Sequence, residues 1–120
     1  MCFVTGTPIL MTNGTSKAIE DIVVGDEVKL GGRVERLFQI EIDRYLCLNG
    51  HIGVTPEHPM LSNGKWLRAN MICPIDTLTD DECKRVGVIS FESVHRLTMV
   101  HNIQTEKHVY VASRMIVHNG

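Results

Sequence analysis

The sequence predicts an all-β domain with little helix. Short runs rich in Val, Ile and Leu are separated by clusters of Gly, Asn and Asp, which is typical of strands joined by turns. No segment keeps a helical stripe of apolar residues over several turns. The chain also matches itself at an offset of 50 residues. These observations predict mostly antiparallel strands and an internal duplication.

The expected strands follow the apolar runs, which cover residues 34–42, 45–48, 86–91 and 108–111. Asn-Gly pairs predict tight turns between strands, because both residues tolerate the positive φ angles that such turns need. These pairs stand at positions 13–14, 49–50 and 63–64. Residues 16–22 are expected to form one helical turn.

The internal duplication is visible as identical residues 50 positions apart. The offset aligns Thr5 with Thr55, Asn13-Gly14 with Asn63-Gly64, Ile22 with Ile72, and Asp26 with Asp76. Two copies without a third favour a pseudo-twofold β-domain over a solenoid. The two chain ends can meet at the centre of such a domain.

Size and charge limit the class of protein. A chain of 120 residues is the size of one domain. Its net charge of -2 and scattered Lys and Arg predict no nucleic-acid or anionic membrane partner. No apolar run approaches the roughly 20 residues of a membrane span, and the first residues do not resemble a signal peptide. We expect a soluble monomer.

The four cysteines lack any Cys-x-x-Cys spacing, so no metal site and no cofactor is expected. Cys47, Cys73 and Cys83 are interpreted as small apolar residues or free thiols, with a disulfide or metal site as the less favoured alternative. Cys2 differs, because its thiolate stands next to a single preceding peptide bond and is a candidate nucleophile. The alternative for Cys2 is an ordinary packed or exposed thiol.

A second candidate is the segment TPEHP at residues 55–59. Pro56 and Pro59 stiffen the backbone that carries Thr55 and His58. The His58 imidazole can polarise an amide and protonate its departing nitrogen, and the Thr55 hydroxyl can donate to a developing oxyanion. The alternative is a turn with a capped histidine.

The third candidate is formed by His108, His118 and Asn119 near the end of the chain. An Asn side-chain amide can attack its own backbone carbonyl and release the following residue, here Gly120, when an acid protonates the leaving amine. The two histidines are candidates for that acid. The alternative is an ordinary Asn-Gly turn with slow deamidation.

Taken in order, these motifs resemble the Hint superfamily, which inteins share with the autoprocessing region of hedgehog proteins. Bacterial intein-like domains are the most similar group. The resemblance extends from one end of the chain to the other. Its blocks are CFVTGT at 2–7 with VGDEV at 24–28, VTPEHP at 54–59 with GKW at 64–66, HVYVA at 108–112, and IVHN at 116–119.

The resemblance implies a compact, pseudo-twofold, nearly all-β horseshoe that brings both ends to one centre. A single domain then spans residues 2–119, with Met1 and Gly120 as flanking residues at the two bonds to be cut. Cys2 is the implied nucleophile, assisted by Thr55 and His58. The implied partners are flanking segments of a larger, bacterial host protein, whose location the sequence leaves open.

Two positions depart from the family pattern. Asn102 stands where many inteins carry an Asp in the closing region, so it is a possible modulator of the timing of the steps. Gly120 has no side-chain nucleophile for ligation of the flanks, which favours cleavage over splicing. A native Cys, Ser or Thr at position 120 would instead favour true splicing. Hedgehog-type sterol transfer is disfavoured, because the chain lacks a sterol-recognition extension.

Two other classes remain as alternatives. One is a small metal or redox module that uses the six His and four Cys, although their spacings are scattered. The other is a passive β-domain for interaction, in which the motifs are accidental. Both predict that flanking proteins are never cut.

Overall fold

The computed structural model describes residues 1–119 and is built almost entirely from strands. The strands are β1 (Phe3–Val4), β2 (Pro8–Leu10), β3 (Ser16–Ala18), β4 (Glu27–Val28), β5 (Gly32–Leu48), β6 (Ile52–Val54), β7 (Pro59–Ser62), β8 (Lys65–Arg68), β9 (Thr77–Thr79), β10 (Arg85–Gly87), β11 (Phe91–Thr105), β12 (Val109–Ala112) and β13 (Met115–His118). Within residues 1–119, helix is confined to the 3-10 turns η1 (Ile19–Asp21) and η2 (Ala69–Met71). The all-β prediction is confirmed.

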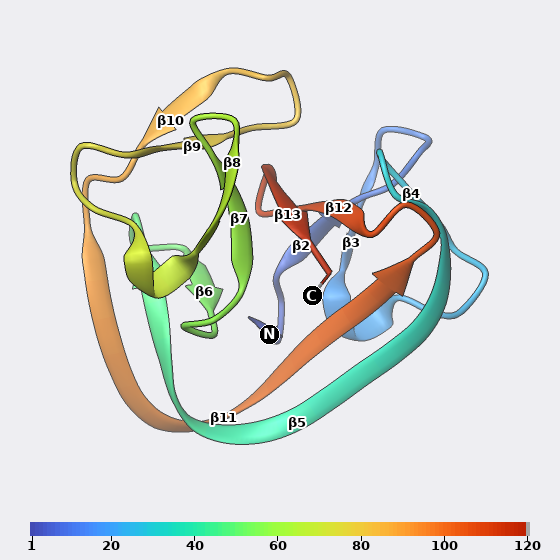
Figure 1. Ribbon diagram of the computed structural model, residues 1–120. Coiled ribbons are helices and arrows are strands. Elements are labelled where there is room, and N and C mark those ends of the chain that lie inside the picture. The colour runs from blue at the N-terminus through green and yellow to red at the C-terminus, as the bar shows by residue number, and fades with distance from the viewer. Residues whose placement is uncertain (120) are drawn as a thin grey trace.

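The strands form two antiparallel sheets. One sheet has the order β11-β1-β6-β5-β4, and the other has the order β10-β9-β7-β13-β12-β2-β3, with β8 added beside β7. Figure 1 shows β5 and β11 as a long curved ribbon around the outside of the molecule, with both chain ends near its centre. This arrangement is the pseudo-twofold horseshoe that the sequence predicted.

The long ribbon differs in detail from the predicted strands. Residues 34–42 and 45–48 lie in one continuous strand, β5, which pairs with β11 along most of its length. The predicted run 86–91 is divided between β10 and β11. The Asn49 side chain explains this break, because its Oδ1 accepts the N–H of Ile89 at 2.7 Å and its Nδ2 donates to the Gly87 carbonyl at 2.9 Å. Side-chain bonds thus replace a strand partner there.

All three predicted Asn-Gly turns join antiparallel strands, β2 to β3, β5 to β6 and β7 to β8. At 63–64 the φ angles are 51° for Asn63 and 78° for Gly64. Positive φ at both central residues is the condition for the tight hairpin turn that matches strand twist. The same holds for Asn49 and Gly50, with φ angles of 53° and 73°, whereas in the first turn only Gly14 has a positive φ, of 86°.

The internal duplication is present in the fold. The turns η1 and η2 occupy equivalent places 50 residues apart. In the first copy Asp26 Oδ2 accepts the N–H of Val23 at 3.0 Å, and in the second Asp76 Oδ2 accepts the N–H of Cys73 at 2.8 Å. The helical turn predicted for 16–22 is shorter than expected, because residues 16–18 belong to β3.

Strand pairing refines the offset between the copies. Pro8 faces Ala18 across the first hairpin, and Pro59 faces Arg68 across the second. The offset is therefore 51 residues before the Asn-Gly turn and 50 after it, since the first turn holds one extra residue. Consequently Thr7 is the first-copy equivalent of His58. The predicted match of Thr5 with Thr55 is wrong by one residue, because Val4 stands at the place equivalent to Thr55.

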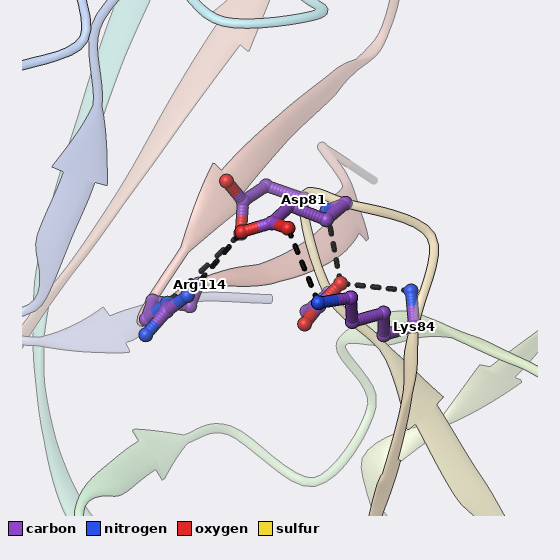
Figure 2. A network of polar contacts seen from close by, with 5 residues as sticks. Asp81, Lys84 and Arg114 are labelled. Carbon is purple, nitrogen blue, oxygen red and sulfur yellow. Dashed lines mark hydrogen bonds and ion pairs between the residues drawn. The ribbon is translucent and has the colours of Figure 1, made fainter.

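Polar contacts join the turn between β9 and β10 to the turn between β12 and β13. Asp81 N–H donates to the Arg114 carbonyl at 3.0 Å, and Arg114 Nε lies 4.0 Å from Asp81 Oδ1. Figure 2 shows Asp81, Arg114 and Lys84 in this network. Arg114 belongs to the turn between β12 and β13, so these contacts anchor the C-terminal hairpin.

The core lies between the sheets and directly beneath the two chain ends. Its fully buried members include Phe3, Ile9, Val54, Met60 and Tyr110. No helix within residues 1–119 has the length and hydrophobicity needed to cross a membrane.

Candidate active site

The two ends of the chain line one cavity of about 540 Å³. Its walls are formed by Met1, Cys2, Phe38, Asn102, Gln104, His108, His118 and Asn119. The sequence motifs predicted that the Cys2 sulfur and the Asn119 carboxamide lie close together. Strand β1 holds the N-terminal side, since Phe3 pairs with Val54 of β6 and with His101 of β11.

Thr55 holds Cys2 by two hydrogen bonds. The Cys2 amide N–H donates to Thr55 Oγ1 at 2.7 Å, and the Thr55 amide N–H donates to the Cys2 carbonyl at 2.9 Å. The hydroxyl therefore contacts the nitrogen of the Met1–Cys2 peptide bond. From the sequence, the hydroxyl was expected at the carbonyl oxygen of that bond.

Cys2 is the buried cysteine of this chain, with 7% of its surface exposed. Burial raises the pKa of its thiol, and the positive amino group of Met1 opposes part of that rise. Cys47 is half-buried, Cys73 and Cys83 are exposed, and none of the four is in a disulfide. Within residues 1–119, no group of His, Cys, Asp or Glu side chains is arranged to hold a metal ion.

His58 lies fully buried between the two ends. Its ring centroid is 4.4 Å from that of Phe3 and 6.4 Å from that of Tyr110. Neither ring nitrogen makes a hydrogen bond of ordinary geometry among residues 1–119, although the backbone of Met1 and of His118 lies beside the ring.

Burial lowers the pKa of His58 to about 3, and the charged amino group of Met1 adds to this effect. The backbone groups of His118 and Met1 oppose it weakly. His58 is therefore neutral at physiological pH, and it lies next to the backbone of both chain ends.

The histidines of the C-terminal side are stacked. The rings of His108 and His118 have centroids 6.2 Å apart and an angle of 17° between their planes. The His118 ring also meets the edge of Trp66, at 5.3 Å between centroids. Burial and the neighbouring His108 lower the pKa of His118. The His108 carbonyl accepts the N–H of Asn119 at 2.9 Å and so fixes the last described residue.

The side-chain nitrogen and the backbone carbonyl of Asn119 lie in different hydrogen-bonding environments. Its Nδ2 atom is buried and has no hydrogen-bond partner among residues 1–119. Its backbone carbonyl, in contrast, accepts a hydrogen bond of 2.7 Å from Asn102 Nδ2. The bond that follows involves Gly120, which lies outside the described residues.

Tyr110 is a site residue that sequence reasoning missed. Its hydroxyl donates to Asn102 Oδ1 at 2.7 Å, and its ring is fully buried beside His58. In the sequence it occupies an apolar strand position. The signal available was that a buried tyrosine hydroxyl needs a partner, but the sequence alone could not identify that partner.

Solved structures resemble this chain along its whole length. A bacterial intein-like domain from Clostridium thermocellum matches 98% of both chains with a TM-score of 0.84 and 24% sequence identity. A DnaB intein from Synechocystis sp. PCC 6803 covers 100% of this chain and 99% of its own, with a TM-score of 0.81 and 18% identity. The chain has the intein fold.

A further intein-fold structure, the AceL NrdHF class 3 split intein, covers 99% of this chain and 98% of its own with a TM-score of 0.83 and 16% identity. No family model and no curated protein matches the chain. The intein fold agrees with the resemblance found in the sequence motifs. It also accounts for the meeting of the two ends.

Proposed function

We propose that this chain is a self-processing domain that cuts its own peptide bonds at Met1–Cys2 and Asn119–Gly120. The observation that carries the proposal is the shared cavity, in which Cys2 and Asn119 lie with His108 and His118. The intein fold supports it. The domain is residues 2–119, and its partners are flanking segments of its own host protein.

In the first step, the Cys2 sulfur attacks the Met1 carbonyl carbon. A thioester bond forms, the amide bond breaks, and the Cys2 nitrogen leaves as an amine after gaining a proton. Thr55 supports this step from the nitrogen side, since its hydroxyl already accepts the Cys2 N–H at 2.7 Å.

His58 can transfer the proton because it is neutral before the reaction. Burial lowers the pKa of His58 and raises that of the Cys2 thiol, so a separate thiolate–imidazolium pair is disfavoured, and His58 takes up the proton as the C–S bond forms. It can then protonate the departing nitrogen. His58 thus still protonates the departing nitrogen, as expected from the sequence, but it first has to receive that proton because it is not charged before the reaction.

The thioester is then open to water, an external thiol or an amine, any of which takes the acyl group and releases the upstream flank. In the second reaction, Asn119 Nδ2 attacks its own backbone carbonyl, a succinimide ring closes, and the bond to Gly120 breaks. His108 and His118 assist by moving protons to the leaving amine. Each domain acts once, and no cofactor takes part.

Gly120 favours cleavage over ligation of the flanks, because a glycine has no side chain to receive the acyl group. True splicing is the alternative when a Cys, Ser or Thr follows Asn119. Two fusion proteins that differ only at position 120 distinguish these outcomes.

The proposal is tested by placing the domain between two soluble proteins and following the products by mass spectrometry, with and without added thiol. Cys2→Ala is expected to abolish upstream cleavage and to keep downstream cleavage. Asn119→Ala is expected to do the reverse. Cys83→Ala, at an exposed cysteine, is the matched control and should cut at both ends.

A wild-type fusion that stays whole over days at mild pH, with and without thiol, contradicts the proposal. That result would favour the passive β-domain. Metal-dependent folding without cutting would favour the metal module.

A further inference from the structure

We propose that Asn102 is a catalytic residue for cleavage after Asn119, and that its side-chain amide donates to the carbonyl oxygen that becomes negative during cyclisation. Tyr110 is the positioning residue that anchors the other end of this amide and holds it beside Asn119. The inference rests on the proposed function, because it assigns roles within the second reaction.

The contact that carries the inference is made to the reacting group itself. Asn102 Nδ2 lies 2.7 Å from the Asn119 carbonyl oxygen. This is the carbonyl whose carbon Asn119 Nδ2 attacks. A donor already placed at that oxygen needs no rearrangement when charge develops.

Charge moves through this contact as follows. The new bond joins Asn119 Nδ2 to the carbonyl carbon, and the electron pair of the C=O bond moves to the oxygen that Asn102 contacts. When the oxygen re-forms its double bond, the bond to the Gly120 nitrogen breaks. The attacking nitrogen loses a proton and the leaving nitrogen gains one, so the products are a terminal succinimide and a free amine.

Tyr110 holds the Asn102 amide in place beside Asn119. The Tyr110 hydroxyl donates to Asn102 Oδ1 at 2.7 Å. A hydroxyl can donate or accept, so the end that faces Asn119 is fixed by the Asn119 carbonyl: a flipped amide would place Oδ1 against that carbonyl, and two acceptors would face each other. The donating orientation is the one that satisfies both contacts.

Tyr110 stays protonated throughout the working pH range. It is fully buried, and burial raises the pKa of its hydroxyl well above the usual value, with a smaller contribution from a charged Cys2 thiolate. The hydroxyl therefore remains a donor at neutral and mildly alkaline pH, and the orientation of Asn102 does not change with pH.

An Asp at position 102 would behave in the opposite way at neutral pH. A carboxylate has no proton to donate, and its charge would repel a negative oxygen 2.7 Å away. Its protonated form could donate again. The Asn at this position, which sequence reasoning treated as the loss of a charged group, is thus a permanent donor.

Other groups around Asn102 also titrate, and the test must separate them. The two cavities that share Asn102 as a lining residue, together with Tyr110, present Cys2, Glu20, His101, His108 and His118. These groups are common to wild type and variants. The ratio of variant to wild-type rate at each pH therefore reports on position 102.

The experiment measures downstream cleavage of the fusion protein in Asn102→Ala and Asn102→Asp variants. Asn102→Ala is expected to be about 100-fold slower than wild type, the usual cost of removing one such donor. Asn102→Asp is expected to be similarly slow near pH 8, with its rate relative to wild type rising about tenfold or more toward pH 5. Thiol-dependent upstream cleavage reports that each variant is folded.

Asn13→Asp is the matched control for the Asn-to-Asp change. Asn13 lies in the first Asn-Gly turn, and its Oδ1 accepts from Thr15. Asp keeps that acceptor, so downstream cleavage should equal that of wild type at every pH.

Tyr110→Phe separates positioning from packing, because it keeps the ring and removes the hydroxyl. We expect downstream cleavage to slow by about five- to tenfold as the Asn102 amide loses its fixed orientation. In the Asn102→Ala background the same change should have little further effect on cleavage. A purely structural role would instead slow both backgrounds equally.

Downstream cleavage of Asn102→Ala within about threefold of wild type overturns the inference. If Asn102→Ala fails to release its upstream flank with thiol, it is misfolded and Asn102→Asp is used instead. The inference is then overturned if Asn102→Asp cleaves downstream at the wild-type rate near pH 8. It is also overturned if the ratio of its rate to that of wild type does not rise on acidification. If the wild-type fusion itself never cuts after Asn119, the proposed function has failed instead.

Discussion

The two copies of the internal duplication share the same backbone hydrogen bonds around Thr7 and His58, but the side chains at these two positions differ in role. In the first copy Thr7 N–H bonds the Val4 carbonyl at 3.2 Å, and in the second His58 N–H bonds the Thr55 carbonyl at 3.2 Å. Each residue's carbonyl then accepts an N–H from the start of a 3-10 turn, that of Ile19 or Ala69.

The side chains at these equivalent positions differ in how their polar atoms are satisfied. Thr7 Oγ1 donates back to the Val4 carbonyl at 2.7 Å and is fully used. The His58 ring is buried without a hydrogen bond of ordinary geometry among residues 1–119, and the backbone of the two chain ends lies beside it. An unpaired buried polar group is costly for stability, and such costs are concentrated where chemistry occurs. The two copies are thus symmetric in their backbone, whereas the side chain proposed to act in the reaction, His58, has no counterpart in the first copy.

The largest test of this comparison exchanges each of the two side chains for an apolar one. His58→Leu is expected to slow thiol-dependent upstream cleavage by about 100-fold or more, because the proton relay is lost. Thr7→Val should cleave at the wild-type rate and lose only about 1 kcal/mol of unfolding free energy, for one hydrogen bond. Rates come from the fusion assay and stability from urea unfolding. Equal losses of cleavage rate in both variants would contradict the assignment of a catalytic role to His58 and not to Thr7.

The pH dependence of stability sharpens the same comparison. The pKa of His58 is about 3 in the folded chain, below its usual value of 6.5. Between about pH 3 and 6.5, His58 is protonated in the unfolded chain and neutral in the folded chain. The contribution of His58 to the free energy of unfolding is therefore fully present above about pH 6.5. It is lost as pH falls toward 3, by at most about 1.4 kcal/mol per pH unit. His58→Leu should show a flatter curve.

This measurement uses chains that carry Cys2→Ala, so that cleavage does not intervene. Thr7→Val in the same background is the control and should keep the wild-type slope. Parallel curves for the chain with and without His58 would show that the histidine is not buried neutral.

The smallest expected effect concerns the acidic turns. Asp26 and Asp76 both accept a backbone N–H, but Asp26 also pairs with Lys17 Nζ at 2.8 Å, whereas Leu67 stands at the equivalent place. The Lys17 contact lowers the pKa of Asp26. Both Asp→Ala variants should lose about 1 kcal/mol of stability, because each loses the acceptor of a backbone N–H, with a few tenths more for Asp26→Ala at low salt. Thermal unfolding at two salt concentrations checks this, and a difference that does not shrink in salt would contradict it.

Much of the fold was predictable because its determinants are local. The three Asn-Gly turns follow from the φ angles that these residues tolerate, and the two copies follow from repeated turn chemistry at Asp26 and Asp76. The predicted break between residues 42 and 45 was wrong, since a curved strand can continue through exposed residues when a partner strand pairs along it. The division of 86–91 depended on the distant Asn49 side chain.

The candidate site was predictable as a set of residue types and less so as geometry. The sequence identified Cys2 and Asn119 because few side chains can attack an adjacent backbone carbonyl. It expected Thr55 at the oxyanion of the Met1–Cys2 bond and did not foresee the 2.7 Å contact with the Cys2 N–H, which joins residues 53 positions apart. Tyr110 was missed because the sequence does not show which polar atom its buried hydroxyl meets.

The sequence by itself determined the all-β class, the duplicated turns and the identity of the reactive groups, since these depend on local backbone preference and on side-chain chemistry. Only the tertiary structure decided that the two ends share one cavity, that His58 is neutral, and that Asn102 faces the Asn119 carbonyl. The reason is physical: burial and the partner of a polar atom are set by segments far apart in the chain, which local sequence preferences do not specify.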